Sequence, residues 1–242
     1  MVLQKASEIL IEFRKILPHD PIIFLDYDGT LVPIIKNPEE SYPDQQIMNI
    51  LERIKRKYDT YIVTGRSLRE IREFMGGDFN VLALHGAVKS LDDGTTDFVK
   101  DYQKYREICD SIYSRREEFF NQYPGVQIIN KDGGLVFTKW HVPEQLFDKL
   151  TAEVKNLSLA TGMELYLGKM IVELRIPGVN KGKAIRGIRN GRPAMIVGDD
   201  LTDEDAYREN PDAFSIHIGD GPTAAKHSLG NYLELRGLLT EL

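Results

Sequence analysis

Apolar residues fall into two patterns along the first third of the chain. Unbroken runs at 21–25 (PIIFL), 60–63 (TYIV) and 80–84 (NVLAL) predict strands that are buried on both faces. Between these runs apolar residues recur every three or four positions, as they do before Pro18 and again after Asp44, which predicts amphipathic helices. Strands alternating with helices in this way predict a parallel sheet covered by helices.

The pattern changes near Lys89 and changes back near Gly178. A turn-rich stretch at 91–97 (LDDGTTD) comes first, and the segment after it reads as helix, hairpin, helix, hairpin, with turns at Asp132-Gly133 and Gly168-Lys169. This order predicts an α+β module with an antiparallel sheet backed by two helices. We therefore predict a core domain formed by 1–88 and 178–242, interrupted by an inserted domain at 89–177.

The α/β pattern returns after the inserted segment. Strands are predicted at 194–198 (AMIVG) and 213–219 (AFSIHIG), with helices at 201–210 (LTDEDAYREN) and 221–229 (GPTAAKHSL). The fold class predicted for the whole chain is α/β, a Rossmann-like parallel sheet flanked by helices, with an inserted α+β domain.

Composition and charge narrow the class of protein. Of 242 residues, 42% are hydrophobic and 28% charged, which is typical of a globular protein. The net charge of -6 argues against a nucleic-acid partner. Cys109 is the single cysteine, so no internal disulfide can form, and its apolar neighbours predict a core position. Without a signal peptide or an apolar run of membrane-spanning length, we expect a cytoplasmic monomer with no membrane partner.

Two acids follow the first buried strand. Asp26 and Asp28 stand at the end of IIFLDYDGT, where parallel α/β sheets bind their ligands, and their period-two spacing lets both point toward one centre. Asp28-Gly29 is also a common turn pair, and the sequence alone favours a turn and a site about equally.

A second buried strand also ends in acids. Asp199 and Asp200 follow AMIVG directly, and three further acids, Asp203 among them, begin the next helix. Thr202 is a candidate N-cap, and acids in a first helical turn complement the helix dipole, which explains Asp203 but not the two earlier residues. Two strand-end clusters of carboxylates predict a site for a hard divalent cation such as Mg²⁺.

Two further segments are suited to phosphate. Thr64, Gly65 and Arg66 follow TYIV, where a hydroxyl and backbone amides at a helix start can hold phosphate oxygens, although a simple capped turn explains them too. Lys181 begins the helix after the inserted segment. The GVNKGKAI stretch around it has the wrong glycine spacing, and Ala184 where a nucleotide-binding P-loop needs Ser or Thr.

Taken in chain order, the segments at Asp26, Thr64, Lys181 and Asp199 resemble the nucleophile, threonine, lysine and acidic motifs of the haloacid dehalogenase superfamily. The insertion resembles the C2-type cap of that superfamily. GDDLTDEDAY, LHGA and GKMIVELRIPGVNKG are also similar to segments of trehalose-6-phosphate phosphatases, with Tyr207 in place of the usual Phe. The resemblance implies a phosphatase for a sugar phosphate. It also implies Mg²⁺ held by Asp26, the Asp28 carbonyl and Asp199, with Asp203 acting indirectly or through water.

The same resemblance implies roles for the other residues. Asp26 would be the nucleophile, forming an aspartyl-phosphate, and Asp28 the general acid and base. Thr64, Gly65, Arg66 and Lys181 would hold the phosphate. The substrate contacts implied are these: His85, Lys169 and Glu173.

The inserted domain departs from the family pattern. NKDGGLVFTKWHVP retains His141 but has Pro143 for an arginine, and the acid–lysine pair is displaced, which leaves Lys131, Arg115 and Arg116 as compensating candidates. Phosphatases for sucrose phosphate or mannosyl-phosphoglycerate, a sugar phosphomutase and an inactive sensor remain as alternatives.

Overall fold

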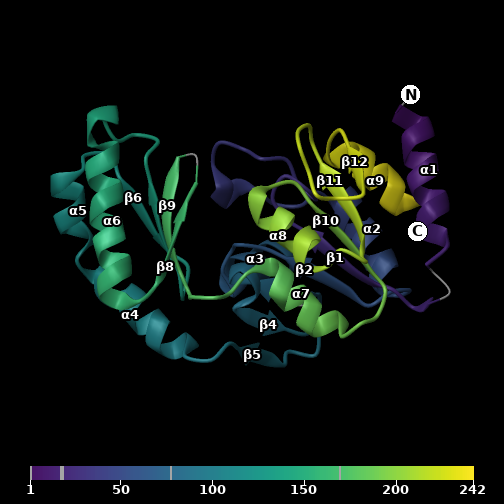
Figure 1. Ribbon diagram of the computed structural model, residues 1–242, viewed down its shortest axis with the longest axis horizontal. Coiled ribbons are helices and arrows are strands. Elements are labelled where there is room, and N and C mark those ends of the chain that lie inside the picture. The colour runs from purple at the N-terminus through teal and green to yellow at the C-terminus, as the bar shows by residue number, and fades with distance from the viewer. Residues whose placement is uncertain (1, 17–18, 77, 169) are drawn as a thin grey trace. The chain divides into compact units, whose positions relative to one another are not determined.

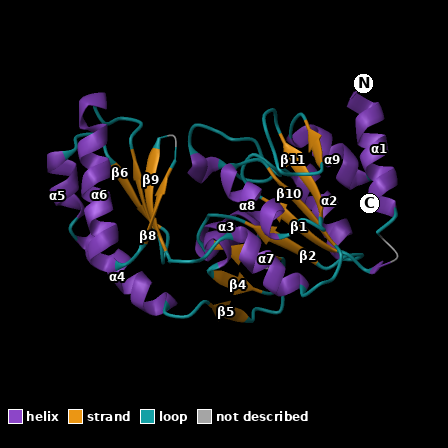
Figure 2. Ribbon diagram, in the orientation of Figure 1, coloured by secondary structure: helices purple, strands orange, loops and turns teal. Residues whose placement is uncertain are grey.

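The two ends of the chain form an eight-stranded sheet (Figures 1 and 2). A computed structural model of the chain describes residues 2–16, 19–76, 78–168 and 170–242. The strands of the sheet are β1 (Ile22–Asp26), β2 (Thr60–Val63), β3 (Asn80–Ala83), β4 (Val88–Ser90), β5 (Thr96–Phe98), β10 (Ala194–Gly198), β11 (Phe214–Ile218) and β12 (His227–Leu229). Their order is β12-β11-β10-β1-β2-β3-β4-β5. All pairs from β12 to β3 are parallel, as predicted, and β4 pairs antiparallel with β3.

Helices cover both faces of this sheet. They are α1 (Val2–Arg14), α2 (Gln45–Lys55), α3 (Leu68–Met75), α7 (Lys181–Arg189), α8 (Leu201–Glu209) and α9 (Tyr232–Thr240), with short 3-10 turns η2 (Pro38–Glu40) and η3 (Leu84–Gly86). α7 and α8, in front of the strands in Figure 1, pack through Ile185 and Tyr207 against Phe24 of β1. The alternate residues Ile23 and Leu25 point to the opposite face and are also fully buried. Burial on both faces explains why these strands are continuously apolar.

The register of the sheet brings the ends of three strands together. β1 lies between β10 and β2, with Leu25 opposite Val197 and Asp26 opposite Val63. Because the three strands are parallel, the residues that follow them emerge at one edge of the sheet, where α/β folds place their ligands.

The inserted segment forms a four-stranded antiparallel sheet and its helices. These elements are α4 (Tyr102–Ser114), α5 (Arg116–Gln122), β6 (Gln127–Asn130), β7 (Leu135–Thr138), η4 (Glu144–Leu146), α6 (Phe147–Thr161), β8 (Glu164–Leu167) and β9 (Ile171–Arg175). The strand order is β6-β7-β9-β8, so both predicted hairpins are present. One face of the sheet contributes Leu135, Phe137 and Leu174 to a core that includes Cys109. Cys109 is therefore a core residue, as predicted.

The chain folds into two compact units. One comprises the residues up to Asp97 together with Asn180–Leu242, and the other is Phe98–Val179, called the inserted unit below. The turn-rich stretch expected at the start of the inserted module instead connects β4 to β5, which lengthen the large sheet. The division of the structure thus falls between Asp97 and Phe98, within β5, rather than at residue 89.

Two local expectations differ from the structure. The single long helix expected after residue 101 is divided at Arg115, where φ is -99° and ψ is 18°. The helix predicted at 221–229 is wrong, because residues 220–226 are irregular and 227–229 form β12. Here Glu204 accepts hydrogen bonds from Thr223 Oγ1 (2.6 Å) and Ala224 N (2.8 Å), and Ser215 Oγ accepts one from Lys226 N (2.9 Å). Side chains of α8 and β11 thus satisfy backbone donors that a helix would use.

Candidate active site

A buried lysine bridges the two acidic strand ends. Lys181 Nζ lies 2.6 Å from Asp26 Oδ1 and 2.8 Å from Asp203 Oδ1, and all three side chains are buried. Asn180 caps α7 by accepting a hydrogen bond from Lys183 N, which fixes Lys181 as the first helical residue. The neighbouring Lys183 is exposed. The structure therefore brings Lys181, rather than Lys183, to the predicted site.

The first turn of α8 organises the second acidic strand end. Asp203 Oδ2 accepts hydrogen bonds from the backbone amides of Asp199 (3.1 Å) and Asp200 (3.2 Å). Asp200 accepts in return from Thr202 N (2.8 Å) and Asp203 N (3.1 Å), so Asp200, not Thr202, is the N-cap of this helix. Asp200 therefore has a structural role, and both Asp203 oxygens are already engaged.

The loop after β1 passes directly over Asp199. Thr30 Oγ1 lies 3.4 Å from Asp199 Oδ1. Gly29 has φ of 82°, and a Cβ at this position would lie 2.0 Å from Asp199 Oδ2. Only glycine permits both this backbone conformation and this close approach, so the DGT sequence is what lets the loop reach the second acidic strand end.

The acids form a group that fits a divalent cation. Oxygens of Asp26, Asp199 and Asp203 lie within 4.8 Å of one another. Asp26 Oδ2 is buried and has no hydrogen-bond partner among the described residues. With Asp200 nearby, four carboxylates face the single ammonium of Lys181, and such an excess of buried negative charge is unfavourable without a cation. Oxygen ligands of this kind suit a hard divalent ion.

Burial and charge displace the pKa values of these groups. Burial, together with the neighbouring Asp199 and Asp200, raises the pKa of Asp26 to about 8 against the opposing effect of Lys181. Burial and the charges of Asp203 and Asp200 raise the pKa of Asp199 to about 7. The pKa of Lys181 is raised, because Asp203 and Asp26 outweigh the effect of its burial. The site thus holds a charged lysine among acids that bind protons readily when no cation is present.

Asp28 does not converge with the other acids, contrary to the expectation from its spacing. Its carboxylate accepts a two-pronged pair of hydrogen bonds from Arg66, from Nε at 2.7 Å and Nη2 at 2.6 Å. Arg66 also donates to Pro38 O (2.7 Å), and its guanidinium lies 4.6 Å from the centre of the Phe74 ring. Arg66, predicted as a phosphate ligand, is therefore engaged with Asp28 instead of lying open for an anion.

The other residues predicted for the phosphate lie beside this pair. Thr64 is buried at the end of β2, and its Oγ1 accepts a hydrogen bond from Arg66 N (3.1 Å). His85 is 8% exposed and lies against Gly65. Its ring offers little surface to a substrate in this conformation.

The inserted unit contains a second buried charged group. Glu173 of β9 is 2% exposed and lies 3.3 Å from Lys131 Nζ and 2.6 Å from Arg175 Nη2. The Arg175 guanidinium stacks over the Tyr166 ring at 3.6 Å. Sequence reasoning missed Arg175 and Tyr166, although Arg175 stands two positions after Glu173 and so shares its face of the strand.

The remaining candidates of the inserted unit are not brought to Glu173. Arg115 and Arg116 stand at the junction of α4 and α5, where Arg116 lies over the Tyr113 ring. His141 is exposed in the segment that follows β7. Lys169 lies outside the described residues. Among the compensating candidates, the structure brings only Lys131 to Glu173.

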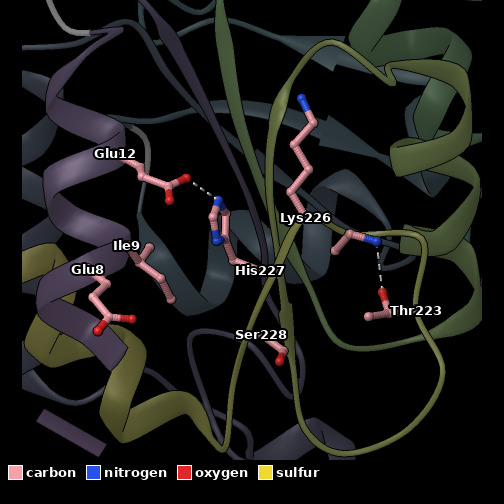
Figure 3. A pocket seen from close by; sticks show the side chains of 8 residues that line it. Glu8, Ile9, Glu12, Thr223, Lys226, His227 and Ser228 are labelled. Carbon is pink, nitrogen blue, oxygen red and sulfur yellow. Dashed lines mark hydrogen bonds and ion pairs between the residues drawn. The ribbon is translucent and has the colours of Figure 1, made fainter. Parts of the chain in front are cut away.

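A separate hollow of about 250 Å³ lies between α1 and β12 (Figure 3). Its lining includes Glu8, Glu12 and Lys226, and His227 Nε2 lies 3.3 Å from Glu12 Oε2 (Figure 3). None of the residues predicted for chemistry lines this hollow. The convergence of motifs, not the hollow, therefore defines the candidate site. No helix in the described ranges has both the length and the apolar character needed to cross a membrane.

The fold is shared with a haloacid dehalogenase-like hydrolase from B. subtilis, which superposes with a TM-score of 0.62 at 16% identity over 91% of this chain and 99% of its own. The chain belongs to the trehalose-phosphatase family, whose model matches residues 24–234.

Relatives of known sequence and structure agree with this membership. The chain is 42% identical to a trehalose-6-phosphate phosphatase-related protein of Thermoplasma acidophilum over 90% of this chain and 95% of the relative. A crystal structure of a trehalose-6-phosphate phosphatase related protein superposes with a TM-score of 0.87 at 42% identity, covering 91% of this chain and 96% of the other. A bifunctional trehalose-6-phosphate synthase/phosphatase of Thermoproteus tenax is 30% identical over 91% of this chain, which spans 32% of that longer protein.

Proposed function

We propose that the protein is a Mg²⁺-dependent phosphatase that converts trehalose 6-phosphate to trehalose and phosphate. Family membership supports the reaction class, and the name of the Thermoplasma relative supports the substrate. The observation that carries the proposal is the buried contact of Lys181 with both Asp26 and Asp203 beside Asp199. A simple turn or helix cap would not need a buried cation at this position.

Asp26 is the proposed nucleophile. One of its carboxylate oxygens attacks phosphorus, the bond from phosphorus to the sugar oxygen breaks, and an aspartyl-phosphate forms. Asp28 donates a proton to the departing sugar oxygen. Asp28 then accepts a proton from the water that attacks the aspartyl-phosphate, which releases phosphate and restores Asp26. Arg66 holds the Asp28 carboxylate through two hydrogen bonds in this conformation, so both proton transfers require Asp28 to turn from Arg66 toward the phosphate.

The phosphate group needs positive charge and hydrogen-bond donors around its oxygens. Lys181 supplies the charge, and Thr64 and the backbone amide of Gly65 supply donors at the start of α3. Bound Mg²⁺ would be held by Asp26, Asp199 and the Asp28 carbonyl, and would neutralise charge on the phosphate oxygens. Asp203 orients Lys181 and the Asp199 backbone, consistent with the engagement of both its oxygens.

The inserted unit is the proposed cap that selects the sugar. Glu173 accepts hydrogen bonds from sugar hydroxyls, and Lys131 donates them in place of the displaced acid–lysine pair. The pairing of Lys131 and Arg175 with Glu173 supports this assignment, because it holds a buried carboxylate in a fixed orientation. Lys169 is proposed as a further sugar contact.

A panel of phosphate esters tests the substrate. Phosphate release is measured for trehalose 6-phosphate, sucrose phosphate, mannosyl-phosphoglycerate and p-nitrophenyl phosphate, each with Mg²⁺ and with EDTA. We expect trehalose 6-phosphate to have the highest kcat/KM and EDTA to abolish turnover. A lower rate with trehalose 6-phosphate than with either of the other two glycosides would overturn the substrate assignment, and phosphate transfer without release would indicate a mutase.

Asp26→Asn tests the chemistry in the same assay. We expect no turnover above background, with a circular dichroism spectrum like that of the wild type. Asp93→Asn, an exposed change in the turn between β4 and β5, is the matched control and should retain full activity. Turnover by Asp26→Asn at the wild-type rate would exclude Asp26 as the nucleophile.

A further inference from the structure

Three consecutive residues after β3 have left-handed backbone angles. The φ values are 49° at Leu84, 58° at His85 and 102° at Gly86. Bulky residues such as leucine rarely adopt this conformation, and such strain persists only where the surroundings impose it. A plain connection from β3 to β4 could place glycine or asparagine at these positions. The strain therefore indicates that the side chains and contacts of this turn are needed where they are.

One side of the turn is fastened to the loop that carries Thr64. Leu84 N donates to Arg66 O and His85 N donates to Thr64 O, both at 2.9 Å. The His85 ring also lies against Gly65, where an added Cβ would come within 2.6 Å of the ring atom Cε1. The turn thus contacts all three residues of the Thr64–Arg66 loop and limits how far that loop can move.

The other side of the turn lies against the first turn of α7. An added Cβ at Gly86 would lie 2.3 Å from the Ala184 Cβ and 3.7 Å from Asn180 O. Asn180 caps α7 and Lys181 is its first residue, so contact at Ala184 and Asn180 fixes the position of the lysine. Gly65 in the loop and Gly86 in the turn lie where these close contacts leave no room for a side chain.

We propose that Leu84–Gly86 is a rigid spacer that sets the separation of Thr64 and Lys181, and that His85 is a positioning residue acting through Gly65. Both groups that the proposed function assigns to the phosphate oxygens are buried, Thr64 at 1% and Lys181 at 2% exposure, so neither can adjust its position freely. This inference rests on the proposed function for its phosphate site. It assigns His85 a role beneath the phosphate-binding loop instead of a contact with the sugar.

Inorganic phosphate is the probe, with its dissociation constant measured by calorimetry at saturating Mg²⁺. Gly65→Ala forces the loop away from the His85 ring, and His85→Gly removes the ring and relieves the strain. We expect each change to weaken phosphate binding roughly tenfold. In the double variant the new methyl group occupies space vacated by the ring, so binding should be tighter than in either single variant. Losses that simply add in the double variant would overturn the spacer.

Two further variants separate positioning from folding. His85→Asn tolerates the left-handed conformation with a shorter side chain, so we expect an unchanged melting temperature but weaker phosphate binding. An unchanged dissociation constant in this variant would overturn the role of His85. Gly187→Ala is the matched control in α7, since its Cβ would meet nothing within 4 Å, and it should bind phosphate like the wild type.

The same measurements distinguish this inference from the proposed function. Phosphate binding does not require turnover, so a wild-type protein that binds phosphate but hydrolyses no sugar phosphate would refute the function and still test the spacer. Absence of phosphate binding in the wild type would overturn both. In the steady state, the spacer predicts that His85→Asn raises KM for p-nitrophenyl phosphate as well as for the glycoside, whereas a sugar contact would change only the latter.

Discussion

The two units of the protein contain buried charged groups of opposite composition. In the first unit one cation, Lys181, lies against two carboxylates, with Asp199 and Asp200 close by. In the inserted unit one carboxylate, Glu173, lies between two cations, Lys131 and Arg175. Among the charges that the structure describes, the first group has an excess of negative charge and the second an excess of positive charge.

This difference indicates different tasks. A metal cation would balance the surplus of carboxylate charge in the first group. Asp26 Oδ2, which is buried and has no hydrogen-bond partner among the described residues, is the oxygen that such an ion would use. The group around Glu173 instead pairs its buried carboxylate with two cations, Lys131 and Arg175, so it does not call for a metal ion. This difference in charge balance agrees with the proposed roles, which are chemistry for the first group and sugar recognition for the second.

Removing the cation of the first group should have the largest effect. Lys181→Met leaves Asp26 and Asp203 facing each other without a counter-charge and removes a donor to the phosphate. We expect kcat to fall roughly 10³-fold and the free energy of unfolding without metal to fall by about 3–5 kcal/mol. Lys183→Met, on the exposed side of the same helical turn, is the control and should change neither. Equal activity of the two variants would remove Lys181 from the mechanism.

Neutralising the carboxylate of the second group should have a smaller and more selective effect. Glu173→Gln weakens the hold on Lys131 and Arg175 without removing the side chain. We expect KM for trehalose 6-phosphate to rise roughly tenfold to a hundredfold, as for the loss of a charged hydrogen bond, while p-nitrophenyl phosphate is hydrolysed as before. Glu118→Gln, exposed on α5, is the matched control. A matching loss with both substrates would show that the two charged groups are not functionally distinct.

The sequence predicted the first group better than the second for a physical reason. Asp26, Thr64 and Asp199 follow buried strands whose parallel order is set by hydrophobic pattern, so their convergence follows from the topology. Contacts around Glu173 depend on the register of antiparallel strands, which pairs Val136 with Glu173 and Tyr166 with Glu173 and is not visible in the pattern alone. The mistaken helix at 221–229 has a similar cause, since side chains distant in sequence, Glu204 and Ser215, accept hydrogen bonds from Ala224 N and Lys226 N.

The sequence also did not predict the direction in which the Asp28 carboxylate points. The spacing of Asp26 and Asp28 predicted convergence, but Arg66 draws Asp28 toward Phe74. A pair of acids two positions apart determines a shared strand face, and the nearest cation then decides where each carboxylate points.

The excess of acid in the first group should make metal binding depend on pH. Asp26 and Asp199 have pKa values of about 8 and about 7 in the metal-free protein, above the ordinary value for an aspartate. Raised carboxyl pKa values stabilise the fold fully at low pH, and this contribution is lost as pH rises through about 7 to 8. A bound cation replaces the protons, so its stabilising effect should grow over the same range.

Thermal melting without MgCl₂ and with MgCl₂ at roughly 100 times its measured dissociation constant checks this expectation. The Mg²⁺-induced rise in melting temperature should be several degrees larger at pH 8 than at pH 6. Asp199→Asn removes one of the two titrating ligands and should shrink the rise at pH 8. An equal rise at both pH values would contradict the proton-for-metal exchange that distinguishes the two groups.

The smallest expected signal comes from Cys109, whose thiol reports on the core beneath the second group. Its side chain is fully buried against Met163, and burial raises the pKa of the thiol to about 12. Because the thiolate is the reactive form, the native protein should react with a thiol reagent at pH 8 far more slowly than the unfolded chain. Following this reaction through a urea titration measures opening of the inserted unit separately from loss of activity. If the thiol becomes reactive at a lower urea concentration than the one at which turnover is lost, the second group belongs to the less stable unit. Coincident transitions would show that one cooperative fold holds both charged groups.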